Sequence, residues 1–499
     1  MHGVYAADQV RAAEAAMLAT VPDGTLMRRA ASGLAQHLAA YLGSTYGRRV
    51  VLLVGAGDNG GDALWAGTEL RRRGAAVTAL LLKPERAHAA GLAALRRARG
   101  RVLPVGPDTM DAARAAVEDA DVVVDGIVGI SGHGPLRDPA PLLVDTADTA
   151  GVPIVACDLP SGVDCDTGIA DGPHVRAAFT VTFGCRKPVH ALAAPLCGPV
   201  RLVDFGLGPF LDSHAPEPDA WVLDDADAGA RWPVPGPADD KYSQGVVGIA
   251  AGSAAYPGAA VLAAGAAALA TSGMVRFAGA AADEVRLHWP EIVATGDITD
   301  AGRTQAWAVG PGIGTGDTGR SVLETVLARE VPTCIDADGI TLLARHDDLR
   351  DRIHGAPVVL TPHAGEFARI AGSVDDDHGG DRLAAARAAA AALGVTVLLK
   401  GNATVVADPD GRTLVDPAAD AWAATAGSGD LLTGMIGALL AAGLDPWWAA
   451  GAGTLVHARA ATLAARAHGL PPVPAPATAI QAAIPSAVRA VRAAAGAHR

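Results

Sequence analysis

Three oxygen-bearing side chains in the first half of this 499-residue chain each follow a run of apolar, mostly β-branched residues. They are Asn59, Asp125 and Ser161. Such runs are typical of strands in a parallel sheet, and the carboxyl ends of neighbouring parallel strands meet at one edge. Amide, carboxylate and hydroxyl oxygens are the ligands that hard cations prefer. The sequence therefore predicts a cation site in one crevice.

A carboxylate follows the same strand as Ser161, and an ammonium follows the next strand of this half. Asp158 begins a Pro-Ser-Gly turn, and Lys187 ends the segment Gly184-Cys-Arg-Lys. Across a pocket such a pair can act as acid and base. The alternative is a structural ion pair, and spacing alone does not decide between the two.

A glycine-rich turn, Gly55–Asp62, follows the first strand and precedes a helix. Backbone N–H groups in such a turn bind phosphate. Asp62 is expected in the first helical turn, facing the ligand. The alternative is a plain tight turn in which Asp62 only begins the helix. Dinucleotide-binding sheets usually carry an acidic residue at the end of the next strand, whereas this strand ends at Lys83-Pro84-Glu85, which is ambiguous.

In the second half, five segments follow strands in order. The last, Ala424–Asp430, contains Gly-x-Gly-Asp before a helix expected to begin near Leu431. Its N–H groups can stabilise charge on a transferred phosphoryl group, and Asp430 can accept a proton. Each segment alone could be a helix cap or turn, and His363 could simply close one. The other four segments are Gly310–Gly314, Asp336–Gly339, Thr361–Glu366 and Lys400–Thr404.

The elements that must position these residues alternate between apolar strands and Ala-rich helices, which indicates α/β domains with parallel sheets covered on both faces. A Pro-rich connector at 209–240, with one short strand at Trp221–Leu223, suggests domains 1–222 and 223–499. The other expected strands are Arg49–Val54, Ala76–Leu82, Asp121–Val124, Pro153–Cys157, Phe179–Phe183, Val246–Ala250, Ala306–Val309, Pro332–Ile335, Val358–Leu360, Val395–Leu399 and Thr404–Ala407.

Composition excludes several classes of protein. The 53 acidic against 40 basic residues give a net charge of −13, which argues against nucleic-acid or anionic membrane partners. The five cysteines show no C-x-x-C spacing, which fits a reducing cytoplasm. Residues 246–275 are uncharged but mostly Ala, Gly and Ser, so we expect a buried strand, turn and helix rather than a membrane span. A soluble, cytoplasmic chain that assembles with copies of itself is the expectation.

Residues 1–215 resemble the NAD(P)H-hydrate epimerases in the Gly55–Asp62 turn, in Asp158–Gly168 and in Thr182–Lys187. The resemblance implies a Rossmann-like domain in which the three oxygen-bearing residues above bind potassium. Two positions depart from the family pattern, because Asp58 replaces an Asn and Ala63 replaces a Gly. The implied residues of the substrate site are Asp58, Asn59, Gly60, Gly61, Asp62, Gly129, Ile130, Ser131, Gly132, His133, Gly134 and Asp158, with Lys187 beside Asp158.

Residues 226–494 resemble the ADP-dependent NAD(P)H-hydrate dehydratases of the ribokinase superfamily. The marks are Tyr256–Ala260, TPHxGEF at 361–367, KGxxT at 400–404 and Lys241 in a K-x-x-x-G pattern; the other histidines, His457 included, are expected on helices or the surface. The resemblance implies ADP with magnesium, with Lys400, Gly401, Asn402, Ala403, Thr404 and Gly429 binding the nucleotide and Ala259, Gly312, His363 and Asp430 binding the hydrated dinucleotide.

Together the two resemblances imply two α/β domains, each doubly wound with three layers, in one chain that repairs hydrated nicotinamide nucleotides. The first domain would interconvert R- and S-NADHX or NADPHX, and the second would dehydrate the S form with ADP. The alternative is a small-molecule kinase of the ribokinase superfamily fused to a non-catalytic, metabolite-binding domain.

Overall fold

The computed structural model describes residues 1–372, 380–417 and 420–497. It divides into two compact units. The N-terminal unit is Gly3–Ala220, and the C-terminal unit is Trp221–Arg499 together with Met1–His2. Each unit is described by itself.

The N-terminal unit contains a seven-stranded parallel sheet in the order β4-β3-β2-β5-β6-β7-β8. The five strands expected in this half are present, whereas the edge strands β4 and β8 were not expected. Both edge strands are partly exposed and therefore lack a continuous apolar run. The bounds are β2 Arg49–Val54, β3 Ala76–Leu81, β4 Arg101–Pro104, β5 Val122–Gly126, β6 Ile154–Cys157, β7 Phe179–Phe183 and β8 Val200–Val203.

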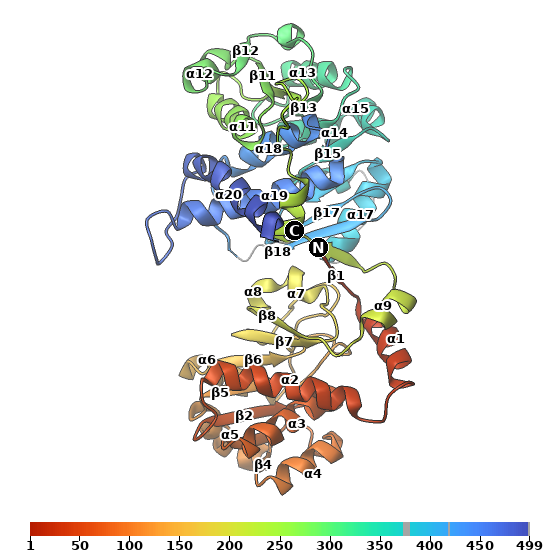
Figure 1. Ribbon diagram of the computed structural model, residues 1–499, viewed down its shortest axis with the longest axis vertical. Helices are drawn as coiled ribbons and strands as arrows, with labels where there is room; N and C mark the ends of the chain where they lie inside the picture. The colour runs from red at the N-terminus through yellow and green to blue at the C-terminus, as the bar shows by residue number, and fades with distance from the viewer. Residues whose placement is uncertain (373–379, 418–419, 498–499) are drawn as a thin grey trace. The chain divides into compact units, whose positions relative to one another are not determined.

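Helices cover both faces of this sheet (Figure 1). Alternate residues of β2 pack into two separate cores, with Leu52 on the side of α1 to α4 and Leu53 on the side of α5 and α6. The strand order reverses between β2 and β5, which makes the crevice at their carboxyl ends the expected ligand position. The helices are α1 Ala7–Leu18, α2 Thr25–Leu42, α3 Asp58–Arg72, α4 Ala89–Arg97, α5 Met110–Glu118, α6 Ala140–Ala150, α7 Val189–Leu192, α8 Ala194–Cys197 and α9 Gly208–His214.

The sheet of the C-terminal unit is mixed, which corrects the expectation of a wholly parallel sheet. Strands β12-β11-β10-β13-β14-β15-β16 are parallel, whereas β17 is antiparallel to both β16 and β18. The cause is loop length, since only residues 400–402 separate β16 from β17 and so short a loop cannot cross over. The bounds are β9 Ala220–Val222, β10 Val246–Ala250, β11 Met274–Ala278, β12 Val293–Thr295, β13 Ala306–Val309, β14 Thr333–Ile335, β15 Val358–Leu360, β16 Thr396–Leu399, β17 Ala403–Ala407 and β18 Thr413–Pro417.

Small residues bring the helices of this unit close together. A Cβ added to Gly434 of α18 would lie 2.1 Å from the carbonyl oxygen of Ala263 in α11, so only glycine fits there. The Ala-rich helices α18 and α19 are mostly buried, as expected. The helices are α10 Asp225–Arg231, α11 Pro257–Ala270, α12 Ala282–His288, α13 Asp317–Leu327, α14 Asp338–Arg345, α15 Asp347–Ile353, α16 Ala364–Ala371, α17 Arg382–Leu393, α18 Ser428–Ala441, α19 Pro446–Ala465 and α20 Ala477–Ala497.

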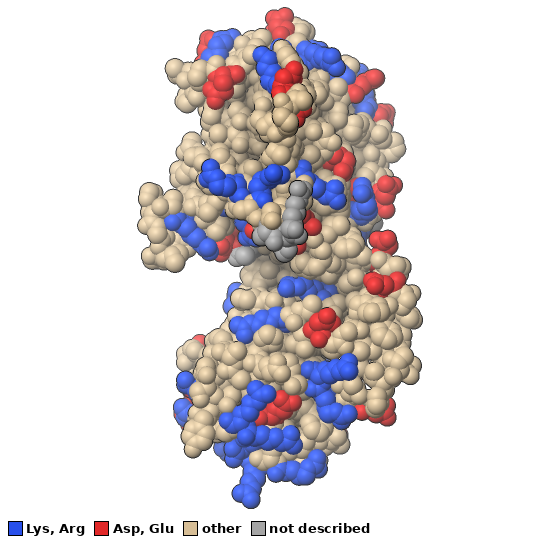
Figure 2. Space-filling model, viewed as in Figure 1, with Lys and Arg blue, Asp and Glu red and all other residues tan. Residues whose placement is uncertain are grey.

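The connector at 209–240 is more ordered than expected, since α9 and α10 lie in it as well as β9. Residues 246–275 form β10 and α11, as expected, and then enter β11. Within the described part of the chain, no helix is both long and apolar enough to cross a membrane. On the face shown in Figure 2, Lys and Arg side chains gather at the end of the N-terminal unit that carries α4 and β4, so the net negative charge is unevenly distributed.

Candidate functional sites

Asn59, Asp125 and Ser161 lie together around the backbone of Val128. The Ser161 hydroxyl donates to Asp125 Oδ1 (2.7 Å) and accepts from the Val128 N–H (3.1 Å). The Asn59 amide donates from Nδ2 to the Val128 carbonyl (2.8 Å), which leaves Asn59 Oδ1 without a hydrogen-bond partner among the described residues. The structure thus brings together the three side chains that the strand ends predicted.

The oxygen donors of this cluster are of the kind that hard cations prefer. Asp125 is fully buried, and burial raises its pKa to about 6, against hydrogen bonds from Ser161 and Ile127 that favour the charged form. No basic side chain is recorded as a partner of Asp125 among the described residues. A bound cation would compensate the buried charge of Asp125, with the Ser161 hydroxyl and Asn59 Oδ1 as further oxygen ligands. The described residues contain no cluster of His, Cys, Asp and Glu for a transition metal.

Asp158 and Lys187 form a buried ion pair, with 2.5 Å between Lys187 Nζ and Asp158 Oδ1. The ammonium also donates to Thr182 Oγ1 (2.9 Å) and to the Phe183 carbonyl (3.2 Å), which engages all three of its protons. Burial opposes charge on Asp158, but the Lys187 ammonium holds the Asp158 pKa below its usual value. This geometry makes Lys187 a partner that holds Asp158 in place.

His190 supports the same carboxylate residue and was not singled out in the sequence. Its Nδ1 accepts from the Lys187 N–H (3.0 Å), so its Nε2 carries the proton and donates to the Asp158 carbonyl (2.9 Å). Burial lowers the His190 pKa to about 4, which keeps the ring neutral. Asp158 itself has a positive φ of 70°, a conformation that this network stabilises.

Two further carboxyl groups, Glu14 and Asp62, line a cavity of about 530 Å³ together with Asp58 and Phe183. Burial raises the pKa of both Glu14 and Asp62, the second well above its usual value. Asp62 Oδ1 is buried, and none of the described residues gives it a hydrogen bond. The helix begins at Asp58, which places Asp62 in its second turn and corrects the expectation of the first.

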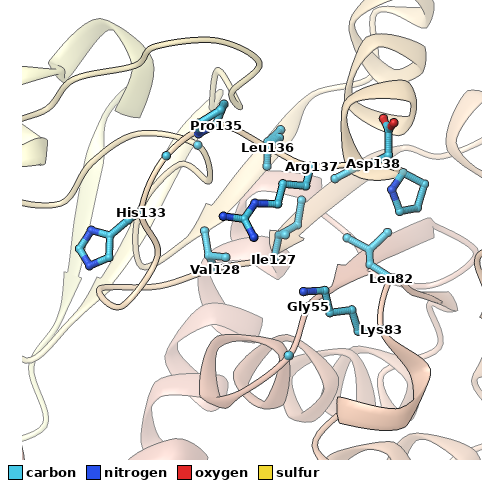
Figure 3. A pocket seen from close by; sticks show the side chains of 15 residues that line it. Gly55, Leu82, Lys83, Ile127, Val128, His133, Pro135, Leu136, Arg137 and Asp138 are labelled. Carbon is cyan, nitrogen blue, oxygen red and sulfur yellow. The ribbon is translucent and has the colours of Figure 1, made fainter.

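A second cavity of the N-terminal unit, of about 270 Å³, lies at the carboxyl ends of β2, β3 and β5 (Figure 3). Gly55 forms part of its floor, and a Cβ there would lie 1.8 Å from the Ile127 carbonyl oxygen. His133 and Gly134, from the predicted substrate segment, line it. Of the remaining predicted residues, Gly60 and Gly61 are buried in α3, Gly129 adjoins Asn59, and Ile130, Ser131 and Gly132 form the loop between them and His133.

In the C-terminal unit a second carboxylate–ammonium pair lies at the strand ends. Lys400 Nζ is 2.8 Å from Asp336 Oδ1, and the Thr433 hydroxyl donates to Asp336 Oδ2 (2.7 Å). Burial opposes charge on Lys400, but Asp336 holds the Lys400 pKa above its usual value. A Cβ at Gly429 would lie 3.6 Å from Lys400 Nζ, so the ammonium lies directly beside the first turn of α18.

Lys400, the ammonium of this pair, lines a cavity of about 540 Å³. The predicted nucleotide-binding residues Lys400, Gly401, Asn402, Thr404 and Gly429 all line it, whereas Ala403 is buried in β17. His363 also lines the cavity. It caps α16 through a hydrogen bond from the Gly365 N–H to Nδ1 (3.0 Å), as the turn interpretation predicts, while its side chain stays more than half exposed.

His457 lies in the helix α19, as expected, and its buried side chain lines the cavity wall. Its Nε2 lies 2.9 Å from the Ser428 hydroxyl. Burial lowers the His457 pKa to about 4. Lys241, which the sequence pattern favoured as functional, is exposed and does not line this cavity.

Asp430 lies in the first turn of α18, which begins at Ser428 rather than near Leu431. Gly427 precedes it with φ of 82°, the left-handed conformation that lets the chain enter the helix. Burial, and then the Asp336 carboxylate, raise the Asp430 pKa to about 6, while Lys400 acts in the opposite direction. A carboxylate with this pKa can accept a proton near neutral pH.

Ala259 and Gly312, predicted to bind the same ligand, adjoin each other: a Cβ at Gly312 would lie 3.3 Å from Ala259 Cβ. The loop that carries Gly312 is fixed by a hydrogen bond from the Gly314 N–H to Asp338 Oδ2 (2.9 Å). Leu262, one turn along α11 from Ala259, lies 2.5 Å from where a Gly427 Cβ would be. The N-terminal ends of α11 and α18 therefore meet beside this loop.

Comparison with known proteins matches each unit to a family. Residues 247–485 match the family model described as NAD(P)H-hydrate dehydratase, and residues 23–189 match that of the YjeF-related protein N-terminus. The bifunctional NAD(P)H-hydrate repair enzyme of Mycobacterium leprae is 53% identical over 98% of this chain and 100% of its own length. The corresponding enzyme of Mycobacterium tuberculosis (strain CDC 1551) is 55% identical over 89% of this chain and 90% of its own.

Among solved structures, the ADP/ATP-dependent NAD(P)H-hydrate dehydratase of Bacillus subtilis, co-crystallised with ATP and Mg²⁺, aligns with a TM-score of 0.47 and 26% identity. The alignment covers 55% of this chain and 99% of that one.

Proposed function

The chain belongs to the bifunctional NAD(P)H-hydrate repair enzymes, and we propose from this membership that it restores hydrated nicotinamide nucleotides by two reactions. Residues 1–222 epimerise R- and S-NAD(P)HX, and residues 223–499 dehydrate the S form to NAD(P)H while ADP is converted to AMP and phosphate. The observation that carries the proposal is that each unit has a carboxylate–ammonium pair at the carboxyl ends of its strands and a cavity next to it. Phe183, whose carbonyl accepts from Lys187, lines the first cavity, and Lys400 itself lines the second.

In the epimerase reaction, Asn59, Asp125 and Ser161 would hold a potassium ion. When bound, that ion would supply positive charge beside a polyanionic substrate. Asp158 would face the hydrated ring with Oδ2, since Lys187 and Thr182 both engage Oδ1. A carboxylate kept ionised in this way can accept a proton from the ring and return it.

In the dehydratase reaction, Asp430 would accept the proton of the ring hydroxyl. The hydroxyl oxygen then attacks the terminal phosphorus of ADP, and the bond from that phosphorus to AMP breaks. Elimination of phosphate from the new ester, together with a ring proton, restores the double bond. The N–H groups of the first turn of α18 would hold the charge that develops on the phosphoryl group. Lys400 would bind the nucleotide phosphates, with magnesium as their counter-ion.

The test gives the full-length protein a mixture of NADHX epimers with potassium, magnesium and ADP, and follows recovery of dihydronicotinamide absorbance. Complete recovery supports both activities. Recovery of the S fraction alone would leave a dehydratase with a metabolite-binding N-terminal domain. No recovery, with phosphorylation of another alcohol instead, would establish the kinase alternative. A cytoplasmic homo-oligomer without nucleic-acid or membrane partners is part of the same proposal.

A further inference from the structure

The cavity at the ends of β2, β3 and β5 carries two basic side chains that nothing above employs. Lys83 follows β3, and Arg137 lies on the segment after β5. Both are exposed, and no hydrogen bond or ion pair from either side chain is found among the described residues. In Figure 3 the two side chains extend into the same space. The nearby carboxylate of Asp138 is directed away from them.

The position of the cavity identifies the part of a dinucleotide that it would bind. It lies where the strand order reverses, between β2 and β5, and next to the Gly-rich turn that begins at Gly55. In dinucleotide-binding sheets of this kind the residue at the end of the second strand contacts the adenosine ribose. An acidic residue there binds the 2′-hydroxyl, whereas a basic residue accommodates a 2′-phosphate. Lys83 occupies that place, two residues after the end of β3.

We propose that Lys83 and Arg137 form a 2′-phosphate subsite, so that the N-terminal unit prefers hydrated NADPH to hydrated NADH. This inference rests on the proposed epimerase function and adds a specificity to it. The two cations differ in what they supply, since a guanidinium can make two parallel hydrogen bonds to a phosphate while an ammonium acts as a point charge. Together they match the double negative charge of a phosphomonoester.

The remaining lining of the cavity agrees with a nucleotide end. Leu82 and Leu136 provide apolar walls, and His133 and Gly134 connect the cavity to the segment expected to contact the substrate. Glu14 and Asp62 line the other cavity, of about 530 Å³. Phe183, whose carbonyl accepts from the Lys187 beside Asp158, lines it too, so the hydrated ring would be placed there. The adenosine 2′-phosphate would therefore lie away from the acid–base groups and affect binding rather than chemistry.

The test uses Lys83→Gln and Arg137→Gln in the full-length chain, with Arg86→Gln as the matched control. Arg86 is exposed three residues from Lys83, does not line the cavity, and its replacement changes the net charge equally. Exchange between pure R and S epimers is followed without ADP, so that dehydration does not contribute. We expect kcat/KM for NADPHX to fall about tenfold with each cavity variant, as for loss of a charged hydrogen bond. The value of kcat/KM for NADHX should stay within about twofold of the wild-type value.

Equal losses with both substrates, or no loss with NADPHX, would overturn the proposal. If the wild-type protein exchanges neither substrate, the epimerase function fails, and direct binding then tests the subsite by itself. The probe is 2′,5′-ADP, titrated calorimetrically into the wild type and into the Lys83→Gln/Arg137→Gln double variant. Weaker binding by the double variant supports the subsite, whereas equal binding overturns it.

Discussion

Each unit of this chain has a carboxylate–ammonium pair at the carboxyl ends of its strands, but the two pairs have different surroundings. The Lys187 side chain is only 2% exposed and all its protons have protein partners. The Lys400 side chain is 22% exposed, lines a cavity, and has Asp336 as its one recorded partner among the described residues. An ammonium that the protein has fully engaged can position a neighbour, whereas one with free protons can bind a ligand.

Replacing the enclosed lysine tests this difference with the largest expected effect. In Lys187→Met, Asp158 is left buried without its counter-ion, which costs about 3–5 kcal/mol of folding free energy for the N-terminal unit. Chemical denaturation of the full chain, with a probe in each unit, measures the loss. Asp158→Asn/Lys187→Met should recover part of it, because both charges are then absent. A fully stable Lys187→Met that loses only epimer exchange would make Lys187 a catalytic residue instead.

The pKa of Asp430 depends on the neighbouring Asp336–Lys400 pair, and Asp430 should be the residue whose loss most affects dehydration. In Asp430→Asn the proton acceptor is absent, so we expect ADP-dependent recovery of absorbance to fall at least about a hundredfold, the usual contribution of a general base. Epimer exchange in the same sample should be unchanged. Asp410→Asn, in an exposed turn of the same unit, is the matched control. A comparable fall in both variants would contradict the role.

Replacing the open lysine should affect binding more than folding. In Lys400→Met, the affinity for ADP should fall about tenfold or more, because a charged hydrogen bond to phosphate is lost. Asp336 is left without its counter-ion but keeps the hydrogen bonds from Thr433 and from its neighbour's N–H, so the loss of folding free energy should be smaller than the loss in Lys187→Met. Calorimetric titration and denaturation measure the two quantities. A loss of stability as large as that of Lys187→Met would remove the distinction between the pairs.

The difference between the enclosed Lys187 and the accessible Lys400 also shows what could be predicted from the sequence. Strand ends are visible as the ends of apolar runs, so Asn59, Asp125, Ser161 and the Lys400 segment could be grouped in advance. Whether a lysine at a strand end is enclosed depends on side chains from other segments, such as Thr182 and Phe183 around Lys187, and spacing does not contain that information. The strand β17 was expected, at Thr404–Ala407, but its antiparallel direction was not, because its apolar run resembles that of a parallel strand.

Buried histidines were missed for a related reason. His190 and His457 lie in helical segments that look like packing elements. Each has a hydrogen-bond partner distant in sequence, the Asp158 carbonyl for His190 and the Ser428 hydroxyl for His457. The signal that could have identified His190 is its spacing of three residues from Lys187, which allows its ring to accept the Lys187 N–H at the start of a helix.

The smallest expected effect is a change in the pH dependence of dehydration. The reaction needs Asp430 as the carboxylate, and its pKa is raised to about 6, so the rate should be half-maximal near pH 6 and fall about tenfold per unit at lower pH. Since the positive charge of Lys400 lowers this pKa, Lys400→Met should move the midpoint to higher pH. Rates at saturating ADP, measured from about pH 5 to about pH 8, give both midpoints. An unchanged midpoint would mean that the Lys400 ammonium does not affect the pKa of Asp430, and that the Asp336–Lys400 pair only binds the nucleotide.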